Sequence, residues 1–354
     1  DGIRDVAVTG VQTCALPISY FGHCGGCAMQ HLSLQAQVAA KQRVLEDALW
    51  HIGRLRPEAM MAPIRGPEWR YRHRARLSVR RVLKKGRVLV GFHERKSSFV
   101  ADMHSCEVLP ASLSAAIPTL SVLVDGLSVG HRIPQVEIAV GDRVTVLVFR
   151  ILDALSDEDE GRVKQFAEES GFQVWLQAAG PESARVFWPV DAPSLDYALP
   201  EFDVRVRFLS TDFTQVNHAV NQILVRRAVS LLEPNPGERI GDFFCGLGNF
   251  SLPIARQGAS VLGVEGNAGL VRRAAENARL NRPEHAVRFE TSNLFEAETC
   301  ARYQGFDKVL VDPPREGALE LVKSRAIDRV SRLVYVSCDP ATLARDSAIL
   351  VGTQ

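Results

Sequence analysis

Asp242-Phe243-Phe244-Cys245-Gly246-Leu247-Gly248-Asn249-Phe250-Ser251 is the stretch that decides the fold. It joins a predicted buried strand at 239–244 to a predicted helix, and a second predicted strand at 261–265 ends in Glu265. This is a Rossmann-like βαβ pattern, in which glycines let the backbone approach a ligand and an acidic residue can bind a ribose diol. The pattern predicts an α/β fold with a doubly wound sheet.

The later strands indicate which residues share the ligand crevice of this sheet. Predicted strands at 309–311 and 333–336 lead into Asp312 and Cys338, and strand ends in a doubly wound sheet face one crevice. The alternative for Cys338 is a buried core thiol, because free cysteine is among the most buried residue types. Ser251 stands where the dinucleotide fingerprint G-x-G-x-x-G has its third glycine, which favours S-adenosylmethionine over NAD as the cofactor. An NAD oxidoreductase is therefore the less favoured alternative.

Composition sets the broad class. The 354 residues are 46% hydrophobic and 23% charged with a net charge of +1, which predicts roughly two or three packed domains and a local patch for any anionic partner. Seven cysteines and no secretory signal predict reduced thiols and a cytoplasmic location. No apolar run approaches the ~20 residues of a membrane span, and the sequence gives no sign of a stable protein partner.

Two cysteines near the start have the spacing of a metal or cluster site. Cys24 and Cys27 form a C-x₂-C motif, and Cys106 is a candidate third ligand. The fourth ligand is not evident, because Cys14 lies in residues 1–19, which resemble a translated sequencing adapter and are interpreted as a non-native leader. A redox pair or a coincidental spacing is the alternative for the C-x₂-C motif.

A basic segment lies between Arg70 and Lys96, with eleven Lys or Arg residues and one acid. Arg70, Arg72, Arg74 and Arg76 share parity and would line one face of a strand. Such a row suits contacts to the phosphates of a nucleic acid, whereas the alternative is a charged edge strand. The neighbouring patterns predict a helix at 30–54, a hairpin of strands 136–140 and 144–151, a helix capped by Ser156, and strands at 172–176 and 204–209.

These motifs together resemble the RNA uracil-5 methyltransferases, and most closely their iron–sulfur 23S rRNA branch. The matching motifs follow the family's order: Cys24–His31, Tyr71–Leu77, Asp212–Asn217, Asp242–Phe250, Val264–Gly266, Asp312–Arg315 and Ser337–Asp346. The resemblance implies transfer of a methyl group from S-adenosylmethionine to C5 of a uridine in 23S rRNA. The tRNA branch is the alternative, although it usually lacks a Cys-Gly-Gly-Cys element. A cytosine-5 methyltransferase is disfavoured, because Arg315 stands where its second cysteine would be expected.

The resemblance also implies roles for individual residues. Cys338 would add to C6 of uracil as the catalytic nucleophile. The expected cofactor-binding residues are Gln215, Phe244, Asn249, Glu265, Asn293 and Asp312. Asp312 could also reach the edge of a flipped-out uracil. Cys24, Cys27 and Cys106 would hold a [4Fe–4S] cluster, while the family's first cluster cysteine corresponds to Ile18.

The expected organisation is a Rossmann-like methyltransferase domain beside a central mixed α/β RNA-binding domain with the cysteine site. The expected ranges are 20–29 and 63–212 for the central domain, 30–62 for a helical extension packing on the catalytic domain, and 213–354 for the methyltransferase domain. The family's N-terminal OB-fold has no counterpart, and the sequence stops 16 residues after Cys338, before the family's glutamate base. We therefore expect a fragment truncated at both ends, and the functional alternative is a catalytically incomplete RNA-binding fragment.

Overall fold

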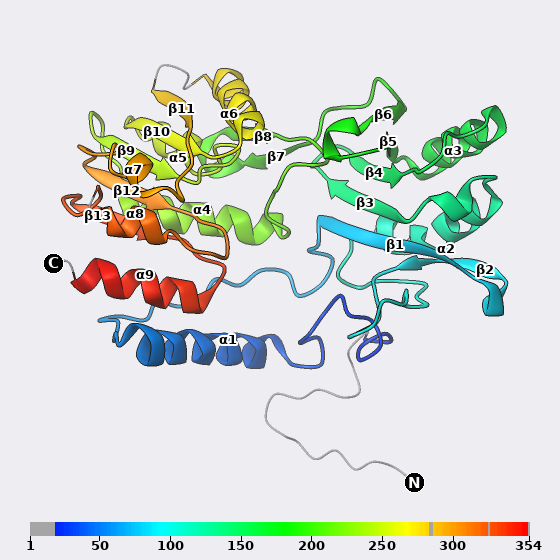
Figure 1. The fold of residues 1–354 in the computed structure, drawn as a ribbon, viewed down its shortest axis with the longest axis horizontal. Coiled ribbons are helices and arrows are strands. Elements are labelled where there is room, and N and C mark those ends of the chain that lie inside the picture. The colour runs from blue at the N-terminus through cyan, green and yellow to red at the C-terminus, as the bar shows by residue number, and fades with distance from the viewer. Residues whose placement is uncertain (1–17, 283–285, 325, 353–354) are drawn as a thin grey trace, which may run out of the picture. The chain divides into compact units, whose positions relative to one another are not determined.

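The computed structural model describes residues 18–282, 286–324 and 326–352 (Figure 1). The chain divides into two compact units. The first contains the residues up to Gln37 together with Gly66–Asp196 and Leu209–Ala219, and the second contains Val38–Arg65, Tyr197–Phe208 and the residues from Val220 onward. Of the helices in the described ranges, none is long and apolar enough to cross a membrane.

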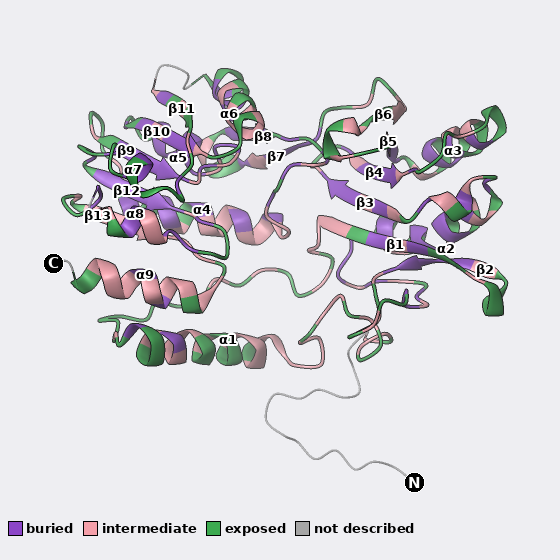
Figure 2. Ribbon diagram, in the orientation of Figure 1, coloured by how far each residue is buried: buried purple, intermediate pink, exposed green. Residues whose placement is uncertain are grey.

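The second unit is built on a five-stranded parallel sheet. Its order is β11-β10-β9-β12-β13, and the strands are β9 (Arg239–Phe243), β10 (Ser260–Glu265), β11 (Val287–Thr291), β12 (Lys308–Val311) and β13 (Arg332–Tyr335). The central strands β9 and β12 are almost wholly buried, as Figure 2 shows. Burial on both faces explains why these strands are continuous apolar runs rather than alternating ones. The predicted Rossmann-like sheet is confirmed.

Helices follow the strands of this sheet. They are α5 (Ser251–Ala255), α6 (Ala268–Asn281), α7 (Ala297–Cys300), α8 (Leu319–Lys323) and α9 (Pro340–Gly352), with α4 (His218–Leu232) preceding β9. The N-terminus of α6 is capped by Asn267, whose side-chain oxygen accepts hydrogen bonds from the N–H groups of Gly269 and Leu270. Residues of β9, β10, β12 and α8 form one apolar core.

A short two-stranded sheet, β7 (Asp196–Leu199) and β8 (Val204–Arg207), is attached to α6 by side chains. The Asn281 amide accepts from the Arg205 N–H at 2.7 Å and donates to the Arg205 carbonyl at 2.8 Å. Asn277 makes the same pair of bonds to Arg207, at 2.9 and 3.0 Å. The two asparagines thus satisfy backbone groups along β8 that another strand would otherwise have to pair.

The predicted helix at 30–54 is α1 (Leu34–Ala48), continued by a π-helical turn at Leu49–Gly53. The turn packs against α9 so closely that a Cβ added at Gly53 would lie 2.7 Å from the Ala344 carbonyl oxygen. Glycine is required there by space rather than by backbone conformation.

The first unit contains a six-stranded mixed sheet. Its order is β2-β1-β3-β4-β5-β6, and the strands are β1 (Arg74–Val82), β2 (Arg87–Gly91), β3 (Gln135–Val140), β4 (Thr145–Arg150), β5 (Gln173–Gln177) and β6 (Arg185–Trp188). The helices α2 (Ala111–Gly126) and α3 (Asp157–Ser170) contribute to its apolar core. The predicted β3–β4 hairpin is confirmed, and so is the cap of α3, because the Ser156 hydroxyl accepts from the Asp159 N–H at 3.2 Å.

The prediction that four arginines line one strand face is wrong, because β1 begins only at Arg74. Arg70 has a left-handed backbone with φ 58°, and Arg72 also precedes the strand. Arg74 is half-buried, and burial lowers the pKa of its guanidinium despite the nearby Glu137. Arg76 is exposed and forms an ion pair with Glu137 at 2.9 Å. The four arginines share parity in the sequence, but Arg70 is left-handed and Arg72 lies outside the strand.

Candidate functional site

The sequence-predicted residues of the second unit lie at the carboxyl edge of its parallel sheet. Each of the five strands is followed by one of them. In spatial order from β11 to β13 they are Asn293, Glu265, Phe244, Asp312 and Cys338, with Glu265 being the last residue of β10. Parallel strands all end at the same edge, which is where doubly wound sheets bind ligands.

Strand register fixes the centre of this edge. Phe243 is paired with Val264 on one side and with Val311 on the other. Beyond the strand, the Phe244 N–H donates to the Val264 carbonyl at 2.8 Å, and the Asp312 N–H donates to the Phe243 carbonyl at 3.1 Å. Phe244 therefore emerges between the ends of β10 and β12, where the strand order reverses.

Phe244 and Phe295 place two aromatic rings at this edge. Phe244 adopts a left-handed backbone with φ 64°, a conformation that costs a non-glycine residue about 1–3 kcal/mol and that concentrates at functional sites. Its ring centroid lies 5.6 Å from that of Phe295, with 57° between the ring planes. Sequence reasoning missed Phe295; the available signal was an aromatic residue two positions after Asn293.

Glu265 is held in place by the glycine loop. Its Oε2 accepts from the Gly246 N–H at 3.2 Å, and its Oε1 accepts from the Asn267 N–H at 2.9 Å. A carboxylate has about four lone-pair sites, so two acceptor positions remain for hydroxyl groups. This arrangement can bind a vicinal diol such as a ribose.

The Asn249 amide is engaged in a polar network of the second unit. Its Oδ1 accepts from the Tyr197 hydroxyl at 2.9 Å and from Asn221 Nδ2 at 3.0 Å, and its Nδ2 donates to Asn221 Oδ1 at 3.0 Å. Both lone pairs of Oδ1 are used, which leaves one N–H on Nδ2. Asn249 can therefore offer a ligand a single donor and no acceptor. Sequence reasoning missed Tyr197 and Asn221, which are distant in the chain.

Two carboxyl groups near the centre of the edge have pKa values near neutrality. Asp242 is wholly buried, and its Oδ2 accepts from the Ser251 hydroxyl at 2.5 Å. Burial raises the pKa of Asp242 to about 7, and the Asp312 charge adds to the rise. Burial likewise raises the pKa of Asp312 to about 7. Ser251, which interrupts the glycine fingerprint, thus supplies the hydrogen bond that holds Asp242.

Cys338 is exposed, so the alternative of a buried core thiol is wrong. It lies in the turn between β13 and α9, where Ser337 and Asp339 fix the backbone. The Ser337 hydroxyl accepts from the Asp339 N–H at 3.1 Å, and Asp339 Oδ1 accepts from the N–H groups of Ala341 and Thr342. The Asp-Pro turn therefore caps α9 and presents the thiol at the strand end.

Asp346 on α9 anchors the loop that follows β12. It is wholly buried, and its Oδ2 accepts from the Ala318 N–H at 2.7 Å and from the Tyr335 hydroxyl at 2.6 Å. Arg345 forms an ion pair with its Oδ1 at 2.7 Å. Gly317 has φ 78°, and an added Cβ would lie 2.6 Å from both Arg345 and Asp346. This network ties the Asp312 loop to the helix that follows Cys338, and sequence reasoning did not find it.

Gln215 belongs to the first unit, within Leu209–Ala219. That segment is bound to the start of the unit's sheet, because the His73 N–H donates to the Val216 carbonyl at 2.8 Å. The His73 and His218 rings stack with centroids 4.1 Å apart. Burial lowers the pKa of His218 to about 4, with a further lowering from His73.

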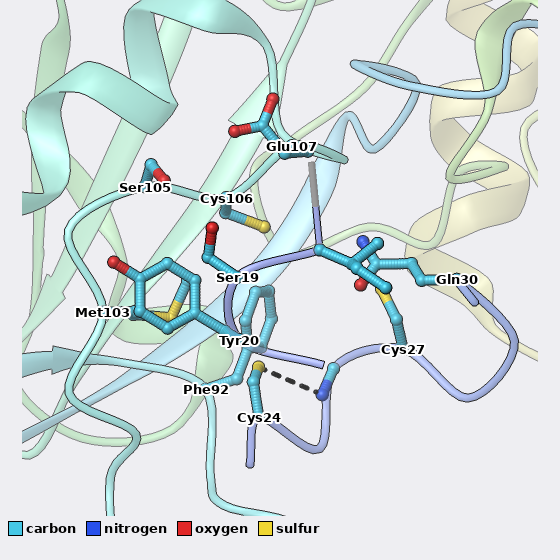
Figure 3. Close-up of a pocket in the computed structure, with 12 residues that line it drawn as sticks. Ser19, Tyr20, Cys24, Cys27, Gln30, Phe92, Met103, Ser105, Cys106 and Glu107 are labelled. Atoms are coloured by element: carbon cyan, nitrogen blue, oxygen red, sulfur yellow. Dashed lines mark hydrogen bonds between the residues drawn. The ribbon is translucent and has the colours of Figure 1, made fainter. Parts of the chain in front are cut away.

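The predicted cysteine site lies elsewhere in the first unit. Cys24, Cys27, Cys106 and Ile18 line a small cavity of about 30 Å³. Figure 3 shows the three cysteines around this pocket. Burial raises the pKa of all three thiols, although the charge of Arg72 acts in the opposite direction. The three predicted residues are thus brought together, with an apolar side chain at the position of the family's first cysteine.

These residues do not fit a cluster held by four thiolates. Across the described ranges, no group of three or more His, Cys, Asp or Glu side chains is arranged to hold a metal ion. The cavity has room for a few water molecules at most. Cys14 lies outside the described residues. The prediction of a [4Fe–4S] cluster is therefore unsupported here.

Comparison with known proteins points to one family. A sequence profile described as tRNA (Uracil-5-)-methyltransferase matches residues 34–354. A 23S rRNA (uracil(1939)-C(5))-methyltransferase RlmD of Aromatoleum aromaticum is 58% identical over 94% of this chain and 77% of its own length. A protein of the same name from Thiobacillus denitrificans is 59% identical with the same coverage.

Among solved structures, the tRNA (uracil-54, C5)-methyltransferase of Pyrococcus abyssi in complex with S-adenosyl-L-homocysteine is similar with a TM-score of 0.68. It covers 92% of this chain and 79% of its own chain at 24% identity, a likeness that supports the fold alone.

Proposed function

Because this chain belongs to the tRNA (uracil-5-)-methyltransferase family, and is by family an S-adenosylmethionine-dependent methyltransferase, we propose that it methylates C5 of a uridine in 23S rRNA. The rRNA substrate is supported by the similarity to proteins named RlmD. Two of these are 58% and 59% identical to this chain over 94% of its length. A tRNA substrate is the second candidate, since the matching family profile is named for tRNA. The proposal is compatible with the predicted cytoplasmic location.

The single observation that carries the proposed chemistry is the exposed Cys338 thiol at the strand edge that also bears Glu265 and Asp312. Uracil C5 is a poor nucleophile, and a thiolate added to C6 converts C5 into an enolate carbon. A nucleophile for this purpose must be accessible to a base taken out of the RNA stack. A buried thiol such as Cys245 could not serve.

We infer the following balanced sequence. The Cys338 thiolate forms an S–C6 bond, and the C5–C6 π electrons move to the enolate. C5 would then attack the methyl carbon of S-adenosylmethionine, so that the C5–CH₃ bond forms as the S⁺–CH₃ bond breaks and S-adenosylhomocysteine leaves. Loss of the C5 proton to a base and expulsion of the thiolate restore the C5–C6 double bond. No described residue is assigned as that base.

The residues at the edge would divide the binding of substrate and cofactor. Glu265 has acceptor positions for the ribose hydroxyls. Asn249 offers one N–H to an acceptor of the cofactor, while Phe244 and Asn293 lie at the ends of the neighbouring strands. Asp312, with its pKa near neutrality, can accept or donate a hydrogen bond at the uracil edge. Gln215 is proposed as a further cofactor contact.

The test uses the chain with 23S rRNA fragments, tRNA and S-adenosylmethionine labelled in its methyl group. Label on uracil C5 of rRNA supports the proposal, whereas label on cytosine or on tRNA alone refutes it. RNA containing 5-fluorouracil blocks proton loss and should trap a covalent complex that Cys338→Ala cannot form. A trapped complex without multiple turnover on normal rRNA would identify the catalytically incomplete alternative.

A further inference from the structure

Phe295 is an exposed aromatic side chain at the carboxyl edge of the parallel sheet, and the family motifs give it no role. We propose that its ring forms one wall of the site for the adenine base of S-adenosylmethionine, and so determines affinity for the methyl donor. This inference deepens the proposed function and depends on it for the identity of the ligand.

The position of Phe295 is fixed by hydrogen bonds. Its N–H donates to Asn293 Oδ1 at 3.1 Å, and Asn293 Nδ2 donates to Glu296 Oε1 at 2.8 Å. The turn after β11 is thus closed by side chains. The Phe295 side chain nevertheless remains 49% exposed, so part of its ring is accessible to a ligand.

Its contact with Phe244 leaves ring surface for a ligand. The two ring planes are inclined at 57° with centroids 5.6 Å apart, so the rings are not stacked face to face. A planar heteroaromatic base can pack against such a face, and this kind of stacking tolerates any base because each has a π-face. A flat aromatic ligand is therefore the chemistry that fits.

The neighbouring strand supplies the partner group for a sugar. Glu265 is paired in register with Thr291, and the Ser292 N–H donates to the Glu265 carbonyl at 3.0 Å. Phe295 follows only a few residues later on the same turn. A carboxylate at the end of β10 and an aromatic ring on the turn after the adjacent β11 match the ribose and the base of one adenosine.

The experiment measures the dissociation constant of S-adenosylhomocysteine by calorimetry with the whole chain and without RNA. Phe295→Ala should weaken binding about 5- to 150-fold, which corresponds to about 1–3 kcal/mol at 1.4 kcal/mol per factor of ten. Phe295→Trp should restore the affinity because it keeps an aromatic face. Its added indole fluorescence should change on titration with S-adenosylhomocysteine beyond the change in the unsubstituted chain.

Phe99→Ala is the matched control, because Phe99 is 66% exposed but lies in the first unit. It should leave the dissociation constant unchanged. The inference is overturned if the dissociation constant of Phe295→Ala stays within twofold of that of the unsubstituted chain. Failure of the proposed function would give a different result. The methyl label would then lie away from uracil C5, while Phe295→Ala would still weaken the binding of S-adenosylhomocysteine.

Discussion

Replacing Asp346 by alanine should destabilise the second unit and misplace the loop that carries Asp312. Three donors converge on this wholly buried carboxylate: the Ala318 N–H, the Tyr335 hydroxyl and the Arg345 guanidinium. Hydrogen bonds to a charged group contribute about 1.5–3 kcal/mol each, so the gross loss is roughly 4.5–9 kcal/mol. Removal of the buried charge also relieves its desolvation, and breaking such pairs costs about 3–5 kcal/mol net. We expect Asp346→Ala to fall in that range.

The matched control is Asp153→Ala. Asp153 also pairs with an arginine, Arg132 at 2.8 Å, but its side chain is 50% exposed. Exposed ion pairs contribute about 0–1 kcal/mol, so the same substitution should have little effect there. Asp346→Asn should lie between the two, because an amide oxygen can still accept from Ala318 or Tyr335 while the pairing with Arg345 is weakened.

The assay is urea unfolding followed by circular dichroism, with S-adenosylhomocysteine added in parallel to identify the transition of the second unit by its shift. Asp346→Ala should also lower kcat/KM, since both Asp312 and Cys338 lie on segments joined through Asp346. The reasoning is refuted if Asp346→Ala costs under 1 kcal/mol, or if Asp153→Ala costs as much.

Four further outcomes follow from the geometry. Asn281→Ala should cost about 2–3 kcal/mol in urea unfolding, because it leaves the N–H and carbonyl of Arg205 without their partner; an equal loss from the exposed Arg279→Ala would contradict this. The pKa of His218 is lowered to about 4 from 6.5, so its contribution to stability is present above pH 6.5 and is lost as the pH falls toward 4. The urea midpoint should drop over that window and drop less in His218→Phe; a midpoint that rises on acidification would exclude the effect. A short maleimide pulse should label Cys338 before Cys245 and Cys300, which peptide mass spectrometry can check, and labelling of the buried pair first would count against the exposed position of Cys338. Anaerobic reconstitution with iron and sulfide should give no stoichiometric four-iron absorption in the unsubstituted chain, whereas Ile18→Cys should show this absorption. A full cluster in the unsubstituted chain would refute the argument that its residues do not fit a cluster.

Sequence reasoning recovered the parts of the fold that depend on local pattern. Short apolar strand patterns identify β9, β10 and β13 in the sequence. The glycine loop after β9, Glu265 at the end of β10 and the thiol after β13 are then located by their positions at the ends of these strands. The arginine row was wrong because parity predicts a shared face only where the backbone is extended, and Arg70 has φ 58°. Side-chain parity carries no information about where a strand begins.

The polar supports of the site could not be predicted in the same way. Ser251 meets Asp242 nine residues away, and Tyr197 meets Asn249 across a much longer separation. In the sequence, Asp346 is one acidic residue in a helical stretch. Only the folded chain brings the Ala318 N–H within hydrogen-bonding distance of its carboxylate. These partners are set by tertiary packing, and one sequence does not reveal which polar residues will be buried together.

The asparagine pair on α6 has a geometric limit. Four residues advance a helix by about 6.0 Å and rotate it by about 40° beyond a full turn, whereas two residues advance a strand by about 6.6–6.8 Å. Two rungs can tolerate this mismatch, but each further rung would swing the side chain farther from the strand. The next backbone N–H in the series, that of Leu209, is instead satisfied by Asp212 Oδ2 at 2.7 Å. A helix can therefore stand in for a missing strand only over a ribbon as short as β8, so lengthening β8 by two residues would require a new partner strand rather than a third asparagine.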